Sequence, residues 1–297
     1  TGATGLVGQF VVQQLVEQGY FVKAFFKNNG YPLPRSLNHP CIEWVEGDLL
    51  DQLCLTKALE NIDYVIHAAA LVSLNPSKKK DIFKVNVDGT AQLINIALNY
   101  PIKKFIYLSS ITTLGYSKKA IEINETKNTS ISLSSLPYAK SKFLAEMEVW
   151  RGAMEGLPII IVHPSTILGP GNWTKGSTQL FRYVWKNPLF YIDGICNYVD
   201  VKKKKKSLCL LLKTNYQNEA FVINAGTISY KSLFSKIAKA FNVRPPCYKI
   251  SFQWMKIGAF IGWVKYALFK SKKDPIITQE SILEAANKGI YSSRKLQ

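Results

Sequence analysis

The chain has 297 residues, of which 47% are hydrophobic and 20% are charged. This composition excludes a disordered protein, and the length allows one large domain or a nucleotide-binding domain with a smaller one. The net charge is +18, and residues 198–297 hold 19 Lys or Arg against 5 Asp or Glu. This basic third suits an anionic substrate, an acidic membrane surface or nucleic acid, or it is a solvated lysine-rich surface.

The spacing of the cysteines and histidines indicates neither a metal site nor disulfide bonds. Five cysteines and three histidines are scattered along the chain without metal-binding or disulfide spacing. We therefore expect no metal site, buried thiols, and a reducing, cytoplasmic compartment.

The chain opens on a glycine-rich turn, with Gly2, Gly5 and Gly8 in its first eight residues. Apolar residues at helical spacing follow, and the predicted helix ends at Gly19. Such a turn suits a diphosphate: Gly2 makes the tight turn, Gly5 lets the backbone approach the ligand, and Gly8 lets the helix pack against a sheet. A plain flexible turn is the alternative.

Strands and helices are predicted to alternate through the first two thirds of the chain. The predicted strands are Tyr20–Phe26, Ile42–Val45, Asp63–His67, Lys104–Ser109 and Pro158–His163, and the predicted helices open near Asp51 and cover Asp81–Asn99 and Tyr138–Met154. This order indicates an α/β fold with a doubly wound parallel sheet. We expect a dinucleotide-binding domain at 1–168. Beyond Gly169 the alternation is expected to break down, giving a substrate-binding region at 169–297, some segments of which return to the sheet.

A candidate proton-transfer pair lies on the helix predicted at Tyr138–Met154. Tyr138 and Lys142 are four residues apart and therefore share one face. A nearby ammonium favours the phenolate form of a tyrosine, which makes it a better acid–base group near neutral pH. Ser109 and Ser110 end a predicted strand, where parallel sheets bind ligands. Such a pair also occurs between surface neighbours, and Ser109 also suits a plain strand-end cap.

Further motifs follow in a fixed order. They are Glu46-Gly47-Asp48-Leu49, His67-Ala68-Ala69-Ala70, Asn86-Val87-Asp88-Gly89-Thr90, the loop from His163 to Gly171, and Val199-Asp200-Val201. With the opening turn, this order resembles the extended short-chain dehydrogenases/reductases, the NAD-dependent epimerase/dehydratase family. The motif sequences are most similar to those of dihydroflavonol 4-reductase-like and 3β-hydroxysteroid dehydrogenase-like members. The resemblance implies a Rossmann-type fold whose central strand comes before the glycine turn, so we expect a short apolar strand before Thr1 in the natural protein.

The resemblance also implies roles for residues. The catalytic set is Ser110, Tyr138 and Lys142, with Ser110 binding the substrate oxygen and Tyr138 moving the proton. The implied cofactor-binding residues are Gly2, Thr4, Gly5, Leu6, Val7, Gly8, Lys27, Asp48, Leu49, Ala68, Ala69, Ala70, Asn86, Tyr138, Lys142, Pro164, Ser165 and Thr166.

The chain departs from the family pattern at three places. His163 stands where arginine is usual, and Lys202–Lys206 replace the acid expected after Val199-Asp200-Val201. The stretch after Ser110 also lacks the Asp-Glu pair of resembling dehydratases, which disfavours a nucleotide-sugar 4,6-dehydratase.

Lys27 bears on the choice of cofactor, because the end of the second strand sets the preference in this fold. The predicted strand there ends in Lys27 without an acid, which favours NADP over NAD. The main functional prediction is hydride transfer between nicotinamide and a carbonyl or secondary alcohol carbon of a small organic substrate. The alternatives are an NAD-dependent nucleotide-sugar epimerase and a non-enzymatic dinucleotide sensor or scaffold.

The basic last third contains no recognition module for nucleic acid, so a small-molecule substrate is the expected partner, and a homodimer is compatible with the sequence. Residues 252–273 combine an apolar stripe with lysines. This pattern predicts either a helix over the substrate pocket or an interfacial helix in peripheral contact with a membrane.

Overall fold

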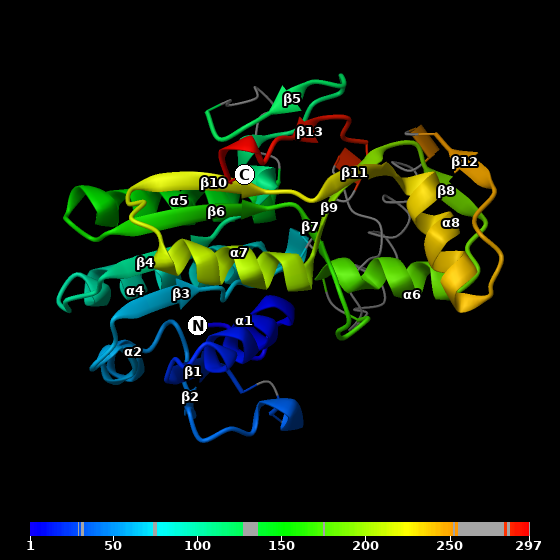
Figure 1. Ribbon diagram of the computed structural model, residues 1–297. Helices are drawn as coiled ribbons and strands as arrows, with labels where there is room; N and C mark the ends of the chain where they lie inside the picture. Colours follow the sequence, from blue (N-terminus) through cyan, green and yellow to red (C-terminus); the bar gives the residue numbers. More distant parts are fainter. Residues whose placement is uncertain are drawn as a thin grey trace.

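A computed structural model gives the fold of the protein (Figure 1). It describes residues 1–28, 30, 33–73, 76–126, 136–174, 176–251, 253–254, 282–283 and 286–296.

The main sheet is parallel and has two parts. Four strands run in the order β10 (Glu219–Ile223), β6 (Ile159–Pro164), β4 (Lys104–Leu108) and β3 (Tyr64–His67). A second parallel pair joins β1 (Val22–Phe26) to β2 (Ile42–Glu46). These bounds confirm the five predicted strands to within two residues.

Residues 1–3 connect the two parts of the sheet by backbone hydrogen bonds. Ala68 N donates to Thr1 O at 3.3 Å, and Thr1 N donates to Ile66 O at 2.7 Å. On the other side, Ala3 N donates to Phe25 O at 3.2 Å. The glycine turn that follows is thereby fixed beside the carboxyl end of β3.

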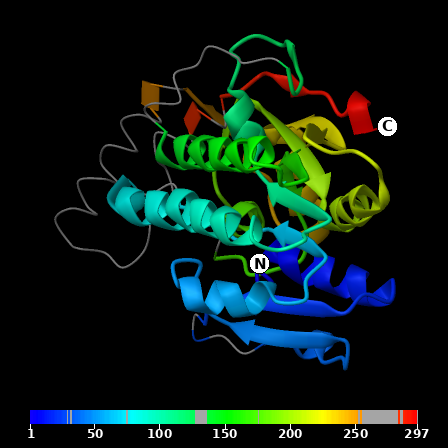
Figure 2. The same cartoon turned by 90° about the vertical axis from the view of Figure 1, so that its left-hand side faces the viewer.

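Helices cover both faces of the sheet. α1 (Leu6–Glu17) and α7 (Val201–Lys213) pack together on one face, and α2 (Gln52–Leu59), α4 (Gly89–Ala97) and α5 (Pro137–Met154) lie on the other (Figures 1 and 2). Each strand supplies apolar side chains to both faces because successive side chains alternate. In β4, Phe105 and Tyr107 join the core under α4 and α5, whereas Ile106 and Leu108 join the core under α1 and α7.

The predicted long helix at Asp81–Asn99 has three parts in the structure. A short α3 (Lys79–Phe83) leads into a π-helical turn at Lys84–Asp88, and α4 follows. Extra residues of this kind in a helix re-aim side chains and are frequent at functional sites. Here the π-helical turn carries Asn86.

A smaller body lies beyond the carboxyl end of β6 (Figure 1). Its strands are β7 (Thr166–Leu168), β8 (Phe190–Ile192), β9 (Ile195–Asp200), β11 (Gly226–Ser229) and β12 (Tyr248–Ile250), with the helices α6 (Gln179–Trp185) and α8 (Tyr230–Phe241). β9 pairs with β7 in parallel and with β11 in antiparallel orientation, and β8 pairs with β12 in parallel. Its core is formed around residues of α8 and β9.

The remaining short elements lie at the edges of these bodies. The strands β5 (Glu122–Ile123) and β13 (Ile290–Tyr291) pair in parallel and so join the end of the chain to the segment after the Ser110 turn. The 3₁₀ turns are Arg35–Leu37, Pro76–Lys78, Ile111–Leu114, Gly176–Thr178 and Arg294–Leu296.

Beyond Gly169 strands and helices no longer alternate strictly, since β8 is followed directly by β9 and β10 by β11, and one segment returns to the main sheet as expected. The lysine run 202–206 lies in α7, and the strand that follows it, β10, is an edge of the main sheet. The sequence did not indicate α7, because lysines 202–206 separate the buried Val201 from the later buried residues Leu208, Leu211 and Leu212. Asp200 caps the start of the helix: its side chain accepts a hydrogen bond from Lys202 N at 2.7 Å.

Of the stretch 252–273, only residues 253 and 254 are described, so the prediction made for it lies outside the described residues. Among the helices that are described, none combines the length and the apolar character needed to cross a bilayer.

Candidate active site

Gly2 and Gly8 let the turn pack closely against the backbone around it. Gly2 has a φ of +72°, and a Cβ on it would lie 2.6 Å from Ala69 N. A Cβ on Gly8 would lie 2.1 Å from Gly2 O, so Gly8 allows close packing of helix and turn. Gly5 is exposed and begins α1 without a side-chain cap, and the first turn of that helix holds no acid. The start of α1 therefore presents backbone N–H groups that suit a diphosphate.

The other residues expected at the turn lie around it. Thr4, Leu6 and Val7 are half-buried at the start of α1, and Ala68, Ala69 and Ala70 are half-buried just after β3. Thr4 O accepts a hydrogen bond from Gln9 Nε2 at 2.8 Å, which ties the turn to the helix.

Lys27 and Asp48 lie next to each other at the ends of β1 and β2. Lys27 Nζ is 2.6 Å from Asp48 Oδ2, and Leu50 N donates to Asp48 Oδ1 at 3.1 Å. Burial raises the pKa of Asp48, but the hydrogen bonds from Lys27 and Leu50 outweigh it and hold that pKa below its usual value. Leu49, expected near the cofactor, is buried in the core below.

Ser110 follows β4 and begins the 3₁₀ turn Ile111–Leu114. Its Oγ accepts a hydrogen bond from Thr112 N at 3.2 Å. The strand-end cap considered for Ser109 is therefore made by Ser110, whereas Ser109 Oγ donates to Glu146 Oε2 at 2.7 Å.

Lys142 reaches from α5 to the end of the same strand. Its Nζ donates to Leu108 O at 2.6 Å and lies 4.2 Å from the centre of the Tyr107 ring. The side chain is 2% exposed, and burial lowers the pKa of Lys142 to about 7, opposed in part by Glu146. Tyr138 is half-buried one turn earlier on α5. The structure thus brings Lys142 to the strand end that Ser110 follows.

Asn86 clamps three segments together from the π-helical turn. Its Oδ1 accepts from Leu71 N at 2.7 Å, and its Nδ2 donates to Leu71 O at 3.1 Å and to Ser141 Oγ at 3.0 Å. Ser141 Oγ in turn donates to Tyr138 O at 2.7 Å. Asn86 therefore connects the loop after β3 to the helix that carries Tyr138.

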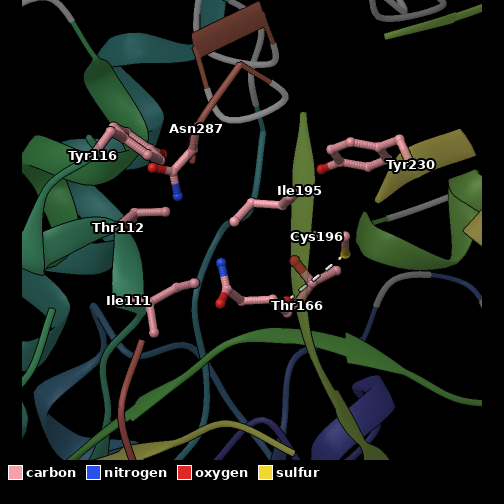
Figure 3. A pocket seen from close by; sticks show the side chains of 9 residues that line it. Ile111, Thr112, Tyr116, Thr166, Ile195, Cys196, Tyr230 and Asn287 are labelled. Atoms are coloured by element: carbon pink, nitrogen blue, oxygen red, sulfur yellow. Dashed lines mark hydrogen bonds between the residues drawn. The ribbon is translucent and has the colours of Figure 1, made fainter. Parts of the chain in front are cut away.

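The end of β6 borders a pocket beside Ser110. Pro164 ends β6, Ser165 is buried with its N–H donating to Ile223 O at 3.0 Å, and Thr166 begins β7. Figure 3 shows side chains from the Ser110 loop, β7, β9, α8 and the end of the chain converging on this pocket. The lining residues are Ile111, Thr112, Tyr116, Thr166, Ile195, Cys196, Asn197, Tyr230 and Asn287.

Two residues of the site were not selected from the sequence. Glu146 is buried on α5 one turn beyond Lys142, and Thr113 is buried within the Ser110 loop. The signal for Glu146 was its spacing, since it repeats the four-residue step from Tyr138 to Lys142. Thr113 gave no such signal. Among the described residues, no group of histidine, cysteine and carboxylate side chains is arranged to hold a metal ion.

Comparison with known proteins identifies related chains. A Synechocystis sp. protein named after dihydroflavonol 4-reductase is 30% identical over 204 residues, which cover 68% of this chain and 59% of that protein. A 3-beta-hydroxysteroid dehydrogenase of Mycolicibacterium neoaurum is 28% identical over 196 residues, which cover 64% of this chain and 51% of that protein. The matched part thus spans less than two thirds of either relative.

Solved structures agree in fold. The crystal structure of gox2253 has a TM-score of 0.81 and 29% identity, covering 99% of this chain and 89% of that one. A UDP-glucuronic acid 4-epimerase from Bacillus cereus, solved in complex with NAD, has a TM-score of 0.72 and 22% identity, covering 84% and 86% of the two chains. A family model described as the NAD dependent epimerase/dehydratase family matches residues 1–187. The glycine turn, the sheet order and this match together show that the chain belongs to the NAD dependent epimerase/dehydratase family.

Proposed function

We propose that this protein is an NAD(P)-dependent oxidoreductase that transfers hydride between nicotinamide and a carbonyl or secondary alcohol carbon of a small organic substrate. The observation that carries the proposal is the contact between Lys142 Nζ and Leu108 O. It brings a buried ammonium to the strand end that Ser110 follows, and Tyr138 precedes it by one helical turn on α5.

The proposed roles follow from proton chemistry. A nicotinamide bound beside this site would supply or accept the hydride at the substrate carbon. During reduction, the Tyr138 hydroxyl gives its proton to the carbonyl oxygen, and the Ser110 hydroxyl hydrogen-bonds that oxygen. Lys142 favours the tyrosinate that remains, because a cation nearby stabilises the charged form. Oxidation of the alcohol runs the same transfers in reverse.

The residues at the turn fit a dinucleotide. Gly2 and Gly8 allow the tight turn, and the exposed Gly5 begins α1, where a diphosphate would be stabilised by backbone N–H groups and by the helix dipole. Asp48 and Lys27 lie at the end where the adenosine half would bind. We propose NADP as the preferred form, because Lys27 offers a cation to a 2′-phosphate.

A nucleotide-sugar epimerase is the second candidate. It is supported by the fold likeness to the Bacillus cereus UDP-glucuronic acid 4-epimerase and by the basic last third of the chain. The two candidates differ in a measurable way: a reductase consumes NADPH with the substrate, whereas an epimerase returns its nicotinamide to the starting state.

The test uses purified full-length protein, with NADPH oxidation followed on aldehydes, ketones and nucleotide sugars. Tyr138→Phe removes only the phenolic proton, so we expect kcat to fall by about 100-fold or more while NADPH affinity persists. Tyr100→Phe is the matched control, since the Tyr100 hydroxyl donates to Thr56 O within α2, away from the Ser110 loop. Turnover of Tyr138→Phe at the wild-type rate contradicts the proposal, and NADPH binding without turnover of any substrate favours a sensor or scaffold.

The finer expectations on organisation and partners are proposals as well. These are a dinucleotide-binding domain at 1–168, a substrate-binding region at 169–297, a homodimer, and peripheral membrane contact through 252–273. Light scattering of the full-length protein tests the dimer, and sedimentation with vesicles of anionic lipid tests the membrane contact.

A further inference from the structure

A buried carboxylate lies beneath the Ser110 loop and joins it to α5. Glu146 is 7% exposed. Its Oε2 accepts a hydrogen bond from Ser109 Oγ at 2.7 Å and another from Thr113 Oγ1 at 3.2 Å. These two hydroxyls come from the residue before Ser110 and from the third residue after it. One carboxylate on the helix thus holds both sides of the loop.

His163 completes the cluster from β6. It is 1% exposed, with Nδ1 lying 3.1 Å from Thr113 Oγ1 and 3.3 Å from Ser110 O. Its Nε2 is 3.6 Å from Glu146 Oε1. Thr113 Oγ1 also lies 2.8 Å from Ser110 O. A proton on His163 Nδ1 would let the ring donate to the loop, leaving the Thr113 proton for Ser110 O or Glu146.

The buried Glu146 carboxylate depends energetically on the hydroxyls around it. A buried carboxylate is costly unless its oxygens receive hydrogen bonds, and breaking such a network by removing one member is more costly than a surface change. Ser109, which donates to Glu146, and Thr113, whose hydroxyl lies 3.2 Å from it, both belong to the segment that carries Ser110. If the loop shifted, the carboxylate would lose these contacts, so the cluster opposes movement of Ser110.

We propose that Glu146 and His163 are positioning residues that hold the Ser110 hydroxyl in register with Tyr138 and Lys142. This inference rests on the proposed function. Tyr138, Lys142 and Glu146 follow one another at four-residue steps on α5. The helix that carries the proton donor is therefore also hydrogen-bonded to the loop that contains Ser110. Misplacement of a catalytic group by about 1 Å can reduce rate strongly, so this attachment acts on kcat rather than on cofactor affinity.

The first part of the experiment separates geometry from charge. Ser109→Ala removes one donor to Glu146 and leaves its negative charge in place. With benzaldehyde as the carbonyl probe, we expect kcat to fall about 3- to 10-fold, with the Kd for NADPH within a factor of two of wild type. Glu146→Gln should lower kcat by about tenfold or more. Glu148→Gln is the matched control, because Glu148 lies on the same helix and pairs with Arg151 at the surface.

The second part asks whether Glu146 acts through Ser110. In a Ser110→Ala background, Glu146→Gln should produce no further loss of kcat beyond a factor of two, because there is no hydroxyl left to position. An equal fold-loss in both backgrounds overturns the inference and points to an effect of Glu146 on Lys142. If Ser110→Ala alone keeps the wild-type kcat, it is the catalytic role of Ser110 in the proposed function that fails.

A conservative pair guards against a variant that merely unfolds. Thr113→Ser keeps the hydroxyl, and Thr113→Val keeps the shape without it. The positioning role predicts that Thr113→Ser retains at least half of wild-type kcat while Thr113→Val loses about tenfold with NADPH affinity unchanged. Equal kcat in the two variants overturns the inference, since the hydroxyl would then be irrelevant.

Discussion

Lys27 Nζ and Asp48 Oδ2 lie 2.6 Å apart at the ends of two adjacent parallel strands. The Lys27 side chain is 60% exposed and that of Asp48 34% exposed. An ion pair with this exposure contributes about 0–1 kcal/mol, because water screens it. Lys27 can therefore leave Asp48 for a ligand phosphate at little cost, and the pair keeps the cation beside the expected adenosine site until then.

This pair makes the cofactor preference testable. Lys27→Ala should weaken NADPH binding about tenfold and leave NADH binding within a factor of two, because only NADPH has the 2′-phosphate. Lys27→Asp should reverse the preference through repulsion. Fluorescence titration with both cofactors measures this. Lys23→Ala is the control, since Lys23 lies on the same strand and donates to Glu60 O. If Lys27→Ala weakened the binding of NADPH and NADH equally, Lys27 would not contact the 2′-phosphate.

Gly8 and Gly5 of the opening turn should have different roles, Gly8 in stability and Gly5 in cofactor binding. A Cβ on Gly8 would meet Gly2 O at 2.1 Å, so Gly8→Ala should lower the free energy of unfolding by more than 2 kcal/mol, an order-of-magnitude figure for overpacking. At Gly5 the nearest atom would be 3.2 Å away, and the residue faces solvent. Gly5→Ala should then fold with nearly wild-type stability but bind NADPH at least tenfold more weakly. Urea unfolding and cofactor titration measure the two effects, and full NADPH affinity in Gly5→Ala would remove Gly5 from the diphosphate site.

The sequence allowed local features to be predicted and left long-range pairs open. Apolar residues at helical spacing located α1, and short apolar runs located the five strands, two of which, β4 and β6, are buried on both faces. The contact between Ser109 and Glu146 was not predictable in this way, since it depends on how α5 crosses the end of β4. The π-helical turn at Lys84–Asp88 was also missed, because residue propensities do not distinguish it from an ordinary helix; it carries Asn86, whose side chain bonds the Leu71 backbone.

Asn86 should be required for stability as well as for the site. Asn86→Leu leaves the N–H and C=O of the half-buried Leu71 without their partner, and each unsatisfied group costs up to about 1–3 kcal/mol, depending on how far water reaches it. We expect the free energy of unfolding to fall by at least about 2 kcal/mol. Asn95→Leu, on the exposed side of α4, is the control for loss of an asparagine. A variant at Asn86 as stable as the control would mean that the Leu71 loop finds other partners.

The last prediction concerns the ammonium of Lys142 and the pH dependence of stability. Burial lowers the pKa of Lys142 from its usual 10.5 to about 7. Below pH 7 the group is protonated in both the folded and the unfolded chain, and the folded chain bears the full cost of a buried charge. Between about pH 7 and 10.5 the unfolded chain binds one more proton than the folded chain, so this group makes the free energy of unfolding rise with pH, by up to about 1.4 kcal/mol per unit.

Lys142→Met removes that dependence. The free energy of unfolding of the Met variant, compared with wild type, should be most favourable below pH 7. As the pH rises from about 7 to 10.5, wild type should gain stability relative to the variant. Loss of the bond to Leu108 O adds a constant offset and leaves the slope unchanged. Urea unfolding of both proteins without cofactor, from about pH 6 to 10, measures the difference, with Lys140→Met on the same helix as the control. Parallel stability curves for wild type and Lys142→Met would show that the ammonium keeps its ordinary pKa, and that burial does not tune the lysine beside Tyr138.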